Sequence, residues 1–521
     1  MPEGSSPPWN TEVPSPDYPA LAANLEVDVA VVGAGITGLT GAYLAVRAGK
    51  SVAVLERGSI AGGETGRTTG FLTAVLDARL IDLIAVHGQQ GARAAWDSSA
   101  KGIELIETQA REEGIECEFR RVDAYLYGPR AKDRRLLARE SRWAITFGYP
   151  VDSIDPGEIP FPSQAVLRVP AQGRIHPSKY MQGLARAIVR RGGEVYENTN
   201  ISRLNPRRNG QHPGAVLTDG HGRTVTAGTI LLSNNAPFVD KRRMYARLRA
   251  CRSYAMRAPV SRGSFPEGLF WNTLDPYDYA RVDAGSRSDS LILGGADHAV
   301  GQVGAPEKAQ SKVTAYWDRV VGSRPTGPVR WSGEILNSED GLPFIGTNPG
   351  SPTREMIAMG FGGNGLTLGT PAGWMFCERL LGRTTPWDQV YDPARRTVST
   401  AGTGLAHVPR APAHRETRAV RSPREIAVGE GAWYSQGGRR LGVYRESGQT
   451  FRATDAQCTH LGCSVEWNPV ERSWDCPCHG SRFDTHGGVL DGPASRPLVS
   501  VELELARPLT RRLRKGPARE G

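Results

Sequence analysis

Apolar and polar positions are most clearly ordered between residues 27 and 56 of this 521-residue chain. Val27–Val32 is a continuous apolar run with the length and β-branched character of a buried strand. Ile36–Ala48 is rich in Ala and compatible with a helix, and a second apolar strand, Ser51–Leu55, stops at Glu56. The pattern therefore predicts a strand, a helix and a second strand joined by short turns.

Three glycines join the first strand to the helix, in the order Gly33, Gly35 and Gly38 of a G-x-G-x-x-G motif. Such glycines permit a tight turn, a close approach of the backbone to a pyrophosphate, and close packing of helix on strand, respectively. The positive end of the helix favours the pyrophosphate, and Glu56 is placed to accept hydrogen bonds from an adenosine ribose. The stretch predicts a dinucleotide site rather than an ordinary glycine turn.

Two further segments are predicted to reach the same cofactor. The loop Arg57–Thr73 carries glycines and hydroxyl side chains that suit a loop passing over a cofactor. The alternative is an ordinary surface loop. Glu355–Leu381 holds a second G-x-G-x-x-G after an apolar strand, but no second strand ending in an acid follows at the required distance. We therefore expect a helix N-terminus that points at another part of one cofactor, where its dipole stabilises negative charge.

The C-terminal part of the chain has a different pattern. Thr397–Arg421 is rich in Ala, Gly, Pro, Arg and His and lacks periodicity, which is typical of a linker. Arg424–Leu505 predicts short strands separated by Gly-rich turns, and therefore a small all-β domain. Two boxes within it, CTHLGC and CPCHGS, contain four of the seven cysteines. Their C-x-H and C-x-x-H pairs offer two thiolates and two imidazoles, which suit either zinc or a two-iron, two-sulfide cluster.

Composition and charge exclude several classes of function. The formal net charge is +10, but the basic residues are scattered except in Arg507–Arg519, so a solvated tail is favoured over a nucleic-acid patch. No apolar run approaches the ~20 residues of a membrane helix. The polar, Pro-rich N-terminus lacks the features of a secretory signal. We expect a cytoplasmic protein without a membrane span and without a nucleic-acid partner.

The two cysteine boxes closely resemble those of Rieske [2Fe-2S] proteins. The resemblance implies four cluster ligands, Cys458, His460, Cys476 and His479, and a disulfide between Cys463 and Cys478 that joins the cluster loops. Residues 492–494 (Gly-Pro-Ala) resemble the loop that covers such clusters. Ser481 stands where high-potential members have a hydroxyl donor, whereas Phe483 replaces their tyrosine. An intermediate or low reduction potential is therefore expected.

Residues 27–383 resemble the D-amino-acid oxidase-like family of FAD enzymes, which includes glycine and sarcosine oxidases. The blocks GAGITG, QGRIHPSKYMQGLARA, DGLPFIG and GFGGNGLTLGTPAG carry this resemblance. With the C-terminal domain, the chain resembles bacterial FAD-dependent oxidoreductases that carry a fused Rieske module.

The combined resemblance implies an α/β (α+β) FAD-binding Rossmann-type domain with an inserted mixed-sheet substrate domain, followed by a small all-β Rieske domain. The expected boundaries are a flexible leader at 1–25, the oxidoreductase domain at 26–396, a linker at 397–421, the Rieske domain at 422–507 and a basic tail at 508–521. The FAD-binding parts are expected at about 26–80, 170–240 and 330–385, and the substrate parts at about 81–169 and 241–329.

The resemblance also implies roles for individual residues. FAD is expected to be non-covalent, because residues 331–346 lack the Cys that tethers FAD in some relatives. Tyr279 and Arg281 are candidates for binding a substrate carboxylate; the alternative is a structural Tyr and a surface Arg. The expected cofactor-binding residues are Gly33, Gly35, Ile36, Thr37, Gly38, Glu56, Arg57, Arg67, Thr68, Thr69, Gly70, Gly341, Gly346, Gly362, Gly363, Asn364, Gly365, Leu366 and Thr367.

The function implied is that of an FAD-dependent amine or amino-acid dehydrogenase that passes electrons from flavin to the Rieske cluster. An external acceptor, a protein or a quinone, would then take them. One alternative is a reductase in which an external donor feeds the cluster and then the flavin. Another is a redox carrier or sensor without catalysis.

Overall fold

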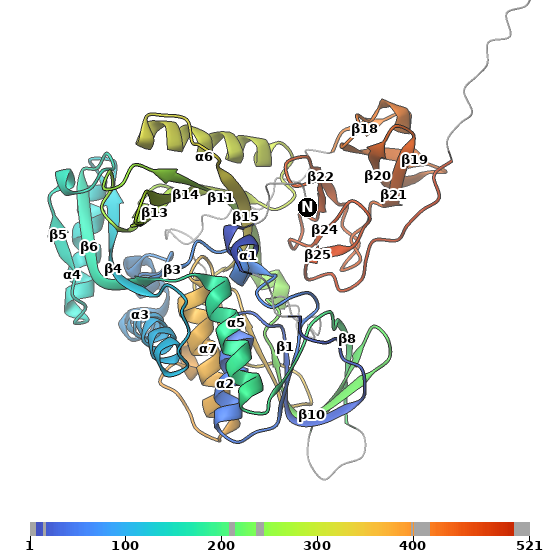
Figure 1. The fold of residues 1–521 in the computed structure, drawn as a ribbon, viewed down its shortest axis with the longest axis horizontal. Helices are drawn as coiled ribbons and strands as arrows, with labels where there is room; N and C mark the ends of the chain where they lie inside the picture. The colour runs from blue at the N-terminus through green and yellow to red at the C-terminus, as the bar shows by residue number, and fades with distance from the viewer. Residues whose placement is uncertain are drawn as a thin grey trace, which may run out of the picture.

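A computed structural model describes residues 7–13, 17–207, 214–235, 244–397, 400 and 417–504. Most of the expected linker and the whole basic tail lie outside these residues. The described chain forms a lower sheet with its helices, a second sheet above it, and an all-β domain on one side (Figure 1).

The first sheet forms around β1, which lies between β10 and β2 and runs parallel to both. The strand order is β16-β17-β10-β1-β2-β7, and β9 joins β8 to the side of β10. The bounds are β1 (Leu25–Val32), β2 (Val52–Leu55), β7 (Glu194–Tyr196), β8 (Ile201–Pro206), β9 (Ala215–Asp219), β10 (Thr224–Leu232), β16 (Phe344–Thr347) and β17 (Glu355–Met359).

Both faces of β1 are buried, which explains its continuous apolar sequence. Val29 and Val31 pack with Leu39 of α2 in one hydrophobic cluster, whereas Ala30 and Val32 belong to the cluster on the opposite face. Four helices lie near this sheet, α2 (Ile36–Arg47), α3 (Leu80–Glu112), α5 (Pro177–Arg190) and α7 (Gly365–Leu380). The predicted strand–helix–strand unit is confirmed.

The second sheet is mixed, and most of its strands come from the expected substrate parts of the chain, whereas β3 and most of β15 lie in the expected FAD-binding parts. Its order is β15-β11-β14-β13-β12-β4-β6-β3, with β5 paired to β6. The strands are β3 (Phe71–Leu72), β4 (Arg120–Gly128), β5 (Asp152–Ile154), β6 (Ala165–Arg174), β11 (Leu248–Val260), β12 (Gly268–Asn272), β13 (Tyr279–Asp283), β14 (Asp289–Ala299) and β15 (Val329–Ser338). Further helices are α4 (Asp133–Thr146), α6 (Ala305–Val321) and α8 (Asp388–Tyr391).

The C-terminal domain consists of two small sheets of four strands each. Trp433, Trp474 and Phe483 fill its core together with Cys458 and Cys476. The first sheet has β18 (Ala419–Val420), β19 (Gly431–Gln436), β20 (Arg439–Ser447) and β21 (Thr450–Asp455). The second has β22 (Glu466–Asn468), β23 (Ser473–Asp475), β24 (Arg482–Phe483) and β25 (Val489–Asp491). The expected α/β fold with an inserted mixed sheet and an all-β C-terminal domain is confirmed.

The expectation of a flexible leader is wrong for the described part of the N-terminus. Residues Pro8–Glu12 form the short helix α1, and the Trp9 side chain is only 2% exposed. Its indole N–H donates to the carbonyl oxygen of Thr68 (2.7 Å). Residues 7–13 therefore pack on the protein, because they bury a large aromatic side chain against the cofactor loop.

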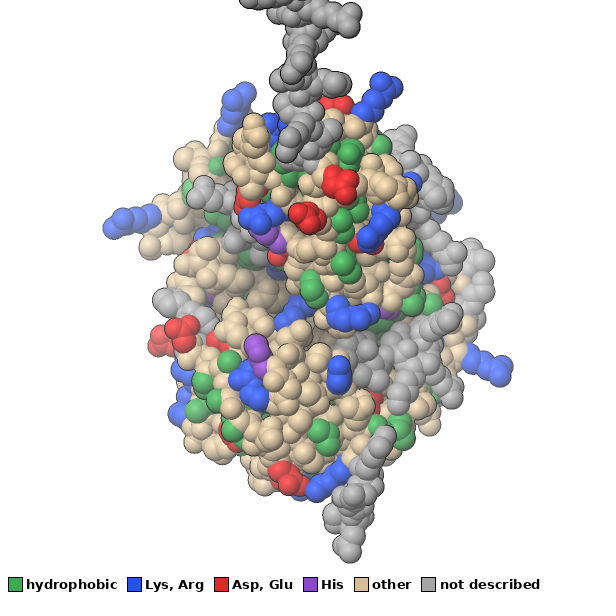
Figure 2. All heavy atoms as spheres, turned by 90° about the vertical axis from the view of Figure 1, so that its right-hand side faces the viewer, with side chains coloured by type: hydrophobic (Ala, Val, Ile, Leu, Met, Phe, Trp, Pro, Cys, Tyr) green, Lys and Arg blue, Asp and Glu red, His purple; other side chains and the backbone are tan. Residues whose placement is uncertain are grey.

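On the face shown in Figure 2, basic and acidic side chains alternate without gathering into one basic patch. No helix of the described part is long and apolar enough to cross a membrane.

Candidate active site and metal centre

A cavity of about 650 Å³ lies where the two large sheets and the C-terminal domain meet. The turn after β1 and the end of β2 line one part of it, and β11, β12 and β13 supply residues of the roof. Residues 489–495 of the C-terminal domain form a further wall. The cavity is therefore completed by two domains.

The turn after β1 has no space for side chains. Gly33 has φ +103°, and a Cβ there would lie 2.9 Å from the carbonyl oxygen of Ser233. A Cβ at Gly38 would overlap the carbonyl oxygen of Gly33. The two glycines thus have the turn and packing roles expected from the motif, and leave a backbone cradle of the kind that binds a pyrophosphate.

Glu56 lies at the wall of the cavity directly after β2. Its carboxylate accepts hydrogen bonds from the amides of Ala34 and Gly58, both at 2.8 Å. Two amides hold the carboxylate in place and leave lone pairs for a ribose hydroxyl. The cradle and this acceptor fit the adenosine and pyrophosphate parts of FAD.

The N-terminus of α7 lies at another part of the cavity, as the second glycine motif predicted. Asn364 ties it to the loop after β3, because its Oδ1 accepts from the Asp77 amide (2.8 Å) and its Nδ2 donates to Val75 (3.1 Å). Asp77 Oδ2 in turn accepts from the Gly363 amide (2.8 Å). Burial raises the pKa of Asp77, although the Gly363 amide and the Tyr277 hydroxyl oppose the shift.

Aromatic and polar side chains form the part of the cavity under the second sheet, which we call the roof pocket. The Tyr279 hydroxyl lies 3.2 Å from the Ser253 hydroxyl, and the rings of Tyr277 and Tyr279 are 6.0 Å apart. The roof pocket is lined by Asp77, Ser253, Trp271, Tyr277, Tyr279 and Phe361. Its shape and composition suit a small organic substrate.

The structure separates the predicted cofactor residues into two groups. Those that line the cavity are Gly33, Gly35, Ile36, Thr37, Glu56, Arg57, Arg67, Thr68, Thr69, Gly362, Gly363, Asn364, Gly365 and Leu366. The others, Gly38, Gly70, Gly341, Gly346 and Thr367, are not among the lining residues.

These exceptions have structural causes. The Thr367 hydroxyl accepts from Ser99 (2.9 Å) in the interior, and Gly346 packs against Pro393. Gly341 lies next to Asp340, which pairs with Arg395 (2.8 Å). Gly341 and Gly346 therefore do not line this cavity, and their contact with the cofactor stays a prediction.

Arg281 does not reach the roof pocket, although Tyr279 does. Its side chain is fully buried and bonds to Asp283 (2.7 Å) and to the carbonyl oxygens of Thr69 (2.7 Å) and Ile175 (2.9 Å). The guanidinium also lies 5.4 Å from the ring centre of Trp9. The proposed carboxylate clamp is therefore wrong for Arg281, because its donors stabilise the loop below the sheet.

Two loops of the C-terminal domain bring together the residues of the cysteine boxes. The rings of His460 and His479 lie 5.0 Å apart. The Cys458 thiol is close enough to Cys476 for a hydrogen bond. This hydrogen bond lowers the pKa of Cys458 to about 6, although burial opposes the shift. The amides of His460 and Leu461 and the Ser481 hydroxyl act in the same direction. Two thiols, one of them readily ionised, and two imidazoles fit a metal centre.

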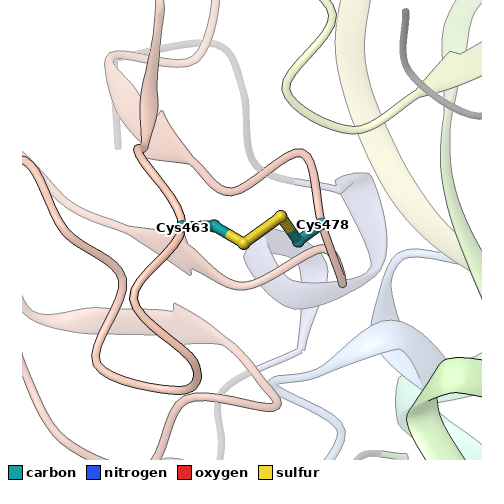
Figure 3. The surroundings of a disulfide bond; sticks show 2 residues. All are labelled: Cys463 and Cys478. Atoms are coloured by element: carbon teal, nitrogen blue, oxygen red, sulfur yellow. A yellow bond between two sulfur atoms is a disulfide. The ribbon is translucent and has the colours of Figure 1, made fainter. Parts of the chain in front are cut away.

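A disulfide between Cys463 and Cys478 joins the two loops (Figure 3). This is the pair that the resemblance implied, and it removes both sulfurs from the set of thiolate ligands. The Ser481 hydroxyl accepts from the Ala494 amide (3.0 Å), which attaches the 492–494 loop to the second box. Phe483 is fully buried beside the two remaining cysteines.

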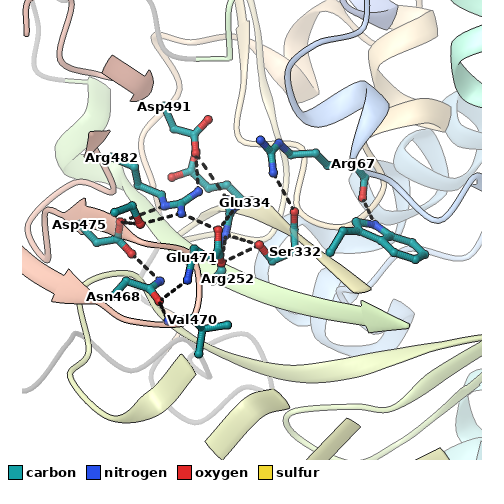
Figure 4. Close-up of polar contacts among 12 residues, drawn as sticks. Arg67, Arg252, Ser332, Glu334, Asn468, Val470, Glu471, Asp475, Arg482 and Asp491 are labelled. Atoms are coloured by element: carbon teal, nitrogen blue, oxygen red, sulfur yellow. Dashed lines mark hydrogen bonds and ion pairs between the residues drawn. The ribbon is translucent and has the colours of Figure 1, made fainter. Parts of the chain in front are cut away.

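Buried ion pairs attach the C-terminal domain to the second sheet (Figure 4). Glu471 accepts from Arg252 of β11 (2.9 Å), Arg482 (2.5 Å), the Tyr254 hydroxyl (3.0 Å) and the Ser332 hydroxyl (2.6 Å). Although burial opposes ionisation, Arg252 and Arg482 hold the pKa of Glu471 well below its usual range. The interface is therefore built around a charged carboxylate with many donors.

Several residues of the site were not found from the sequence. Asp77 lies four positions after the end of the predicted cofactor loop, and this position was the one available signal in the sequence. Arg252 and Glu471 are 219 positions apart, and no local pattern connects them. Arg57, expected to bind cofactor, also donates to the Leu490 carbonyl oxygen across the domain boundary (2.7 Å).

Comparison with protein families matches both parts of the chain. Residues 28–379 match the model described as FAD dependent oxidoreductase, and residues 417–502 match the Rieske [2Fe-2S] domain. A Bacillus subtilis (strain 168) protein named Rieske 2Fe-2S iron-sulfur protein YhfW is 30% identical over 95% of this chain and 97% of its own length.

Two further matches concern the first domain. Gamma-glutamylputrescine oxidoreductase of Escherichia coli (strain K12) is 25% identical over 71% of this chain and 87% of the enzyme. Glycine oxidase from Geobacillus kaustophilus has the same fold, with a TM-score of 0.58 at 19% identity over 72% of this chain and all of that one.

Proposed function

Since this chain belongs to the FAD-dependent oxidoreductase family and continues into a Rieske [2Fe-2S] domain, we propose that it is an amine or amino-acid dehydrogenase. In this proposal electrons pass from FAD to the cluster and then to an external acceptor, a protein or a quinone. The observation that carries the proposal is the shared cavity. Residues 489–495, next to the cysteine boxes, form part of the wall of the predicted FAD site.

The arrangement of the domains supports transfer within one chain. Bound FAD would supply two-electron oxidation of a C–N bond, and a [2Fe-2S] cluster one-electron transfer. The ion pairs of Glu471 join the C-terminal domain to the second sheet beside the cavity. A fixed neighbour is present at a high effective concentration, which is the advantage of joining the two modules.

Individual residues are assigned as follows in the proposal. Cys458 and Cys476 bind one iron of the cluster, and His460 and His479 bind the other. The disulfide fixes the two loops that carry these ligands. The Ser481 hydroxyl and the amides of His460 and Leu461 donate to the Cys458 sulfur and thereby favour its ionised form.

Two features support an amine or amino acid as substrate. The aromatic rings of the roof pocket provide apolar surface that can bury the hydrocarbon part of a small substrate. The relative from Escherichia coli is named for an amine substrate, gamma-glutamylputrescine. A cluster next to the flavin site supports a dehydrogenase rather than an oxidase that consumes oxygen.

An anaerobic titration of the purified holoprotein with a panel of amines and amino acids tests the proposal. Absorbance follows FAD, and electron paramagnetic resonance follows the cluster. We expect a substrate to bleach FAD and a Rieske-type signal to grow afterwards. A Cys458→Ser variant is the matched control, in which bleaching persists and the Rieske signal is absent.

Two results would contradict the proposal. If dithionite produces the signal and no amine or amino acid bleaches FAD, the proposed substrate class is wrong, and electron flow from the cluster to flavin is the better hypothesis. Hydrogen peroxide formation that matches turnover in both the intact protein and the Cys458→Ser variant would contradict a role for the cluster as acceptor.

A further inference from the structure

Resting on the proposed function, we propose that the roof pocket binds the ammonium group of an amine through Asp77, and that the substrate has no carboxylate beside the reacting C–N bond. An amino acid would present a carboxylate that this pocket cannot pair. The inference concerns which charge the pocket recognises and narrows the substrate class to amines.

The position of Asp77 provides the first argument. Its exposed surface faces the cavity, while protein atoms surround the residue on its other sides. The Gly363 amide fixes one carboxylate oxygen at 2.8 Å, and the Tyr277 hydroxyl also donates to the group. An oriented carboxylate in a pocket lined by aromatic rings attracts an organic cation.

The rings around Asp77 provide the second argument. Tyr277, Tyr279, Trp271 and Phe361 line the roof pocket with the carboxylate. Aromatic faces attract cations through their quadrupoles, and they bury the hydrocarbon part of an amine. Aromatic rings around one acid are the usual chemistry of organic ammonium sites.

The distribution of positive charge provides the third argument. Among the described residues that line the cavity, none is Lys or His, and the arginines are Arg57 and Arg67. Arg57 donates to Leu490 of the C-terminal domain, and Arg67 donates to the Ser332 carbonyl oxygen (3.3 Å). Neither lines the roof pocket, so a substrate carboxylate would meet Asp77 without an opposing cation.

Two further arginines lie near the roof pocket but do not line it. Arg281 is bonded to Asp283 and to backbone carbonyl groups below the sheet. Arg79 lies near Asp77, but it does not line the cavity, and its guanidinium donates to the Asn272 carbonyl oxygen (3.2 Å). Its charge also lies close to that of buried Glu140.

Binding to the holoprotein can be measured without turnover. The probes are benzyltrimethylammonium, which is a cation with no N–H to lose, benzoate as the anion and benzyl alcohol as the neutral analogue. Each is titrated against the FAD absorption spectrum and by calorimetry. In the unaltered protein we expect the cation to bind at least tenfold more tightly than the other two.

Variants then locate the interaction. Asp77→Asn keeps the size of the side chain and an acceptor for the Gly363 amide, and should weaken cation binding by about tenfold to a hundredfold, because the Coulomb attraction between the carboxylate and the cation is lost. Asp275→Asn removes an exposed acid that does not line the cavity, and should change it by less than about threefold. Benzyl alcohol should bind equally to all three proteins.

The results separate this inference from the proposed function. Benzoate binding as tight as cation binding in the unaltered protein, or an unchanged cation affinity in Asp77→Asn, would overturn the inference. If the cation binds through Asp77 but benzylamine and other amines leave FAD oxidised, the ammonium site is confirmed and the proposed amine oxidation is wrong. If Asp77→Asn does not retain FAD, the affinities of the three probes for the unaltered protein test the inference, and benzoate binding as tight as cation binding overturns it.

Discussion

Replacing Glu471 by Gln should loosen the C-terminal domain from the second sheet. Gln keeps the size of the side chain, but it removes the negative charge. Its NH₂ group is a donor and would face the donor groups of Arg252 and Arg482. Arg252 and Arg482, both at most 2% exposed, would then lose the charge of one of the two carboxylates that they share, the other being Asp491. Glu471 itself is 8% exposed, so solvent cannot replace the missing acceptor.

The magnitude follows from burial. Removing one partner of a buried ion pair costs about 3–5 kcal/mol. Glu64, Asp475 and Asp491 remain near the two arginines, so the lower end, about 3 kcal/mol, is expected. For a domain of 60–100 residues, 1 kcal/mol shifts the unfolding midpoint by roughly 4–8 °C. The transition of the C-terminal domain should therefore fall by about 10 °C or more.

Scanning calorimetry of the holoprotein measures this effect, and limited proteolysis shows whether the domains separate. The matched control is Glu446→Gln in the same domain, because Glu446 forms an exposed pair with Arg452 (3.0 Å). Exposed pairs contribute about 0–1 kcal/mol. If Glu471→Gln lowers the midpoint no more than this control, the ion pairs do not hold the domain in place.

The pH dependence gives a second test of the same residue. The folded-state pKa of Glu471 is depressed, so the folded protein keeps the carboxylate ionised where the unfolded chain takes up a proton. The stabilisation by Glu471 is present above the unfolded pKa of about 4.5 and is lost as the pH falls below it. The difference between the unaltered protein and Glu471→Gln should shrink from pH 6 to pH 4.

Three further outcomes are expected. Gly38→Ala should abolish FAD retention, measured by absorbance after gel filtration, because its Cβ would overlap the Gly33 carbonyl oxygen; normal FAD content would contradict the cradle. Phe483→Tyr should raise the cluster midpoint potential and Ser481→Ala should lower it, by redox titration, since each changes a hydroxyl beside the cysteines; shifts of opposite sign would exclude the proposed donors. Burial and nearby Asp491 raise the pKa of Glu64 to about 7, so between pH 4.5 and 7 the folded state binds a proton that the unfolded chain has released. The free energy of unfolding of the unaltered protein should therefore decrease as the pH rises from 4.5 to 7. In Glu64→Gln this decrease should be less steep. Equal slopes in denaturant titrations would refute this.

The N-terminal half of the cofactor site could be predicted because it is local. Gly33, Gly35, Gly38 and Glu56 lie within one strand–helix–strand unit, whose turn and packing depend on residues close in sequence. The metal centre is local in the same sense, since Cys458 and His479 fall within two short loops. Glycine geometry and ligand chemistry restrict such stretches so strongly that their residues alone indicate the site.

The residues that line the roof pocket could not be predicted in the same way. Tyr279 and Arg281 are two positions apart on β13, and strand periodicity places both side chains on the same face. Tyr279 reaches the cavity, whereas Arg281 is captured by carbonyl groups of Thr69 and Ile175 beneath Trp9. The residues around Arg281 come from the N-terminus (Trp9), the loop before β3 (Thr69) and the position directly after β6 (Ile175), and nothing in the sequence of β13 indicates their positions.

The sequence by itself determined the two cofactor modules and their order along the chain. Only the tertiary structure decided that residues 489–495 complete the FAD cavity, that Asp77 lies against Gly363, and that Glu471 pairs with Arg252. These contacts join residues separated by more than 200 positions. They form because large surfaces pack together and each buried charge must then find a partner, a condition set by the assembled fold and not by any local pattern.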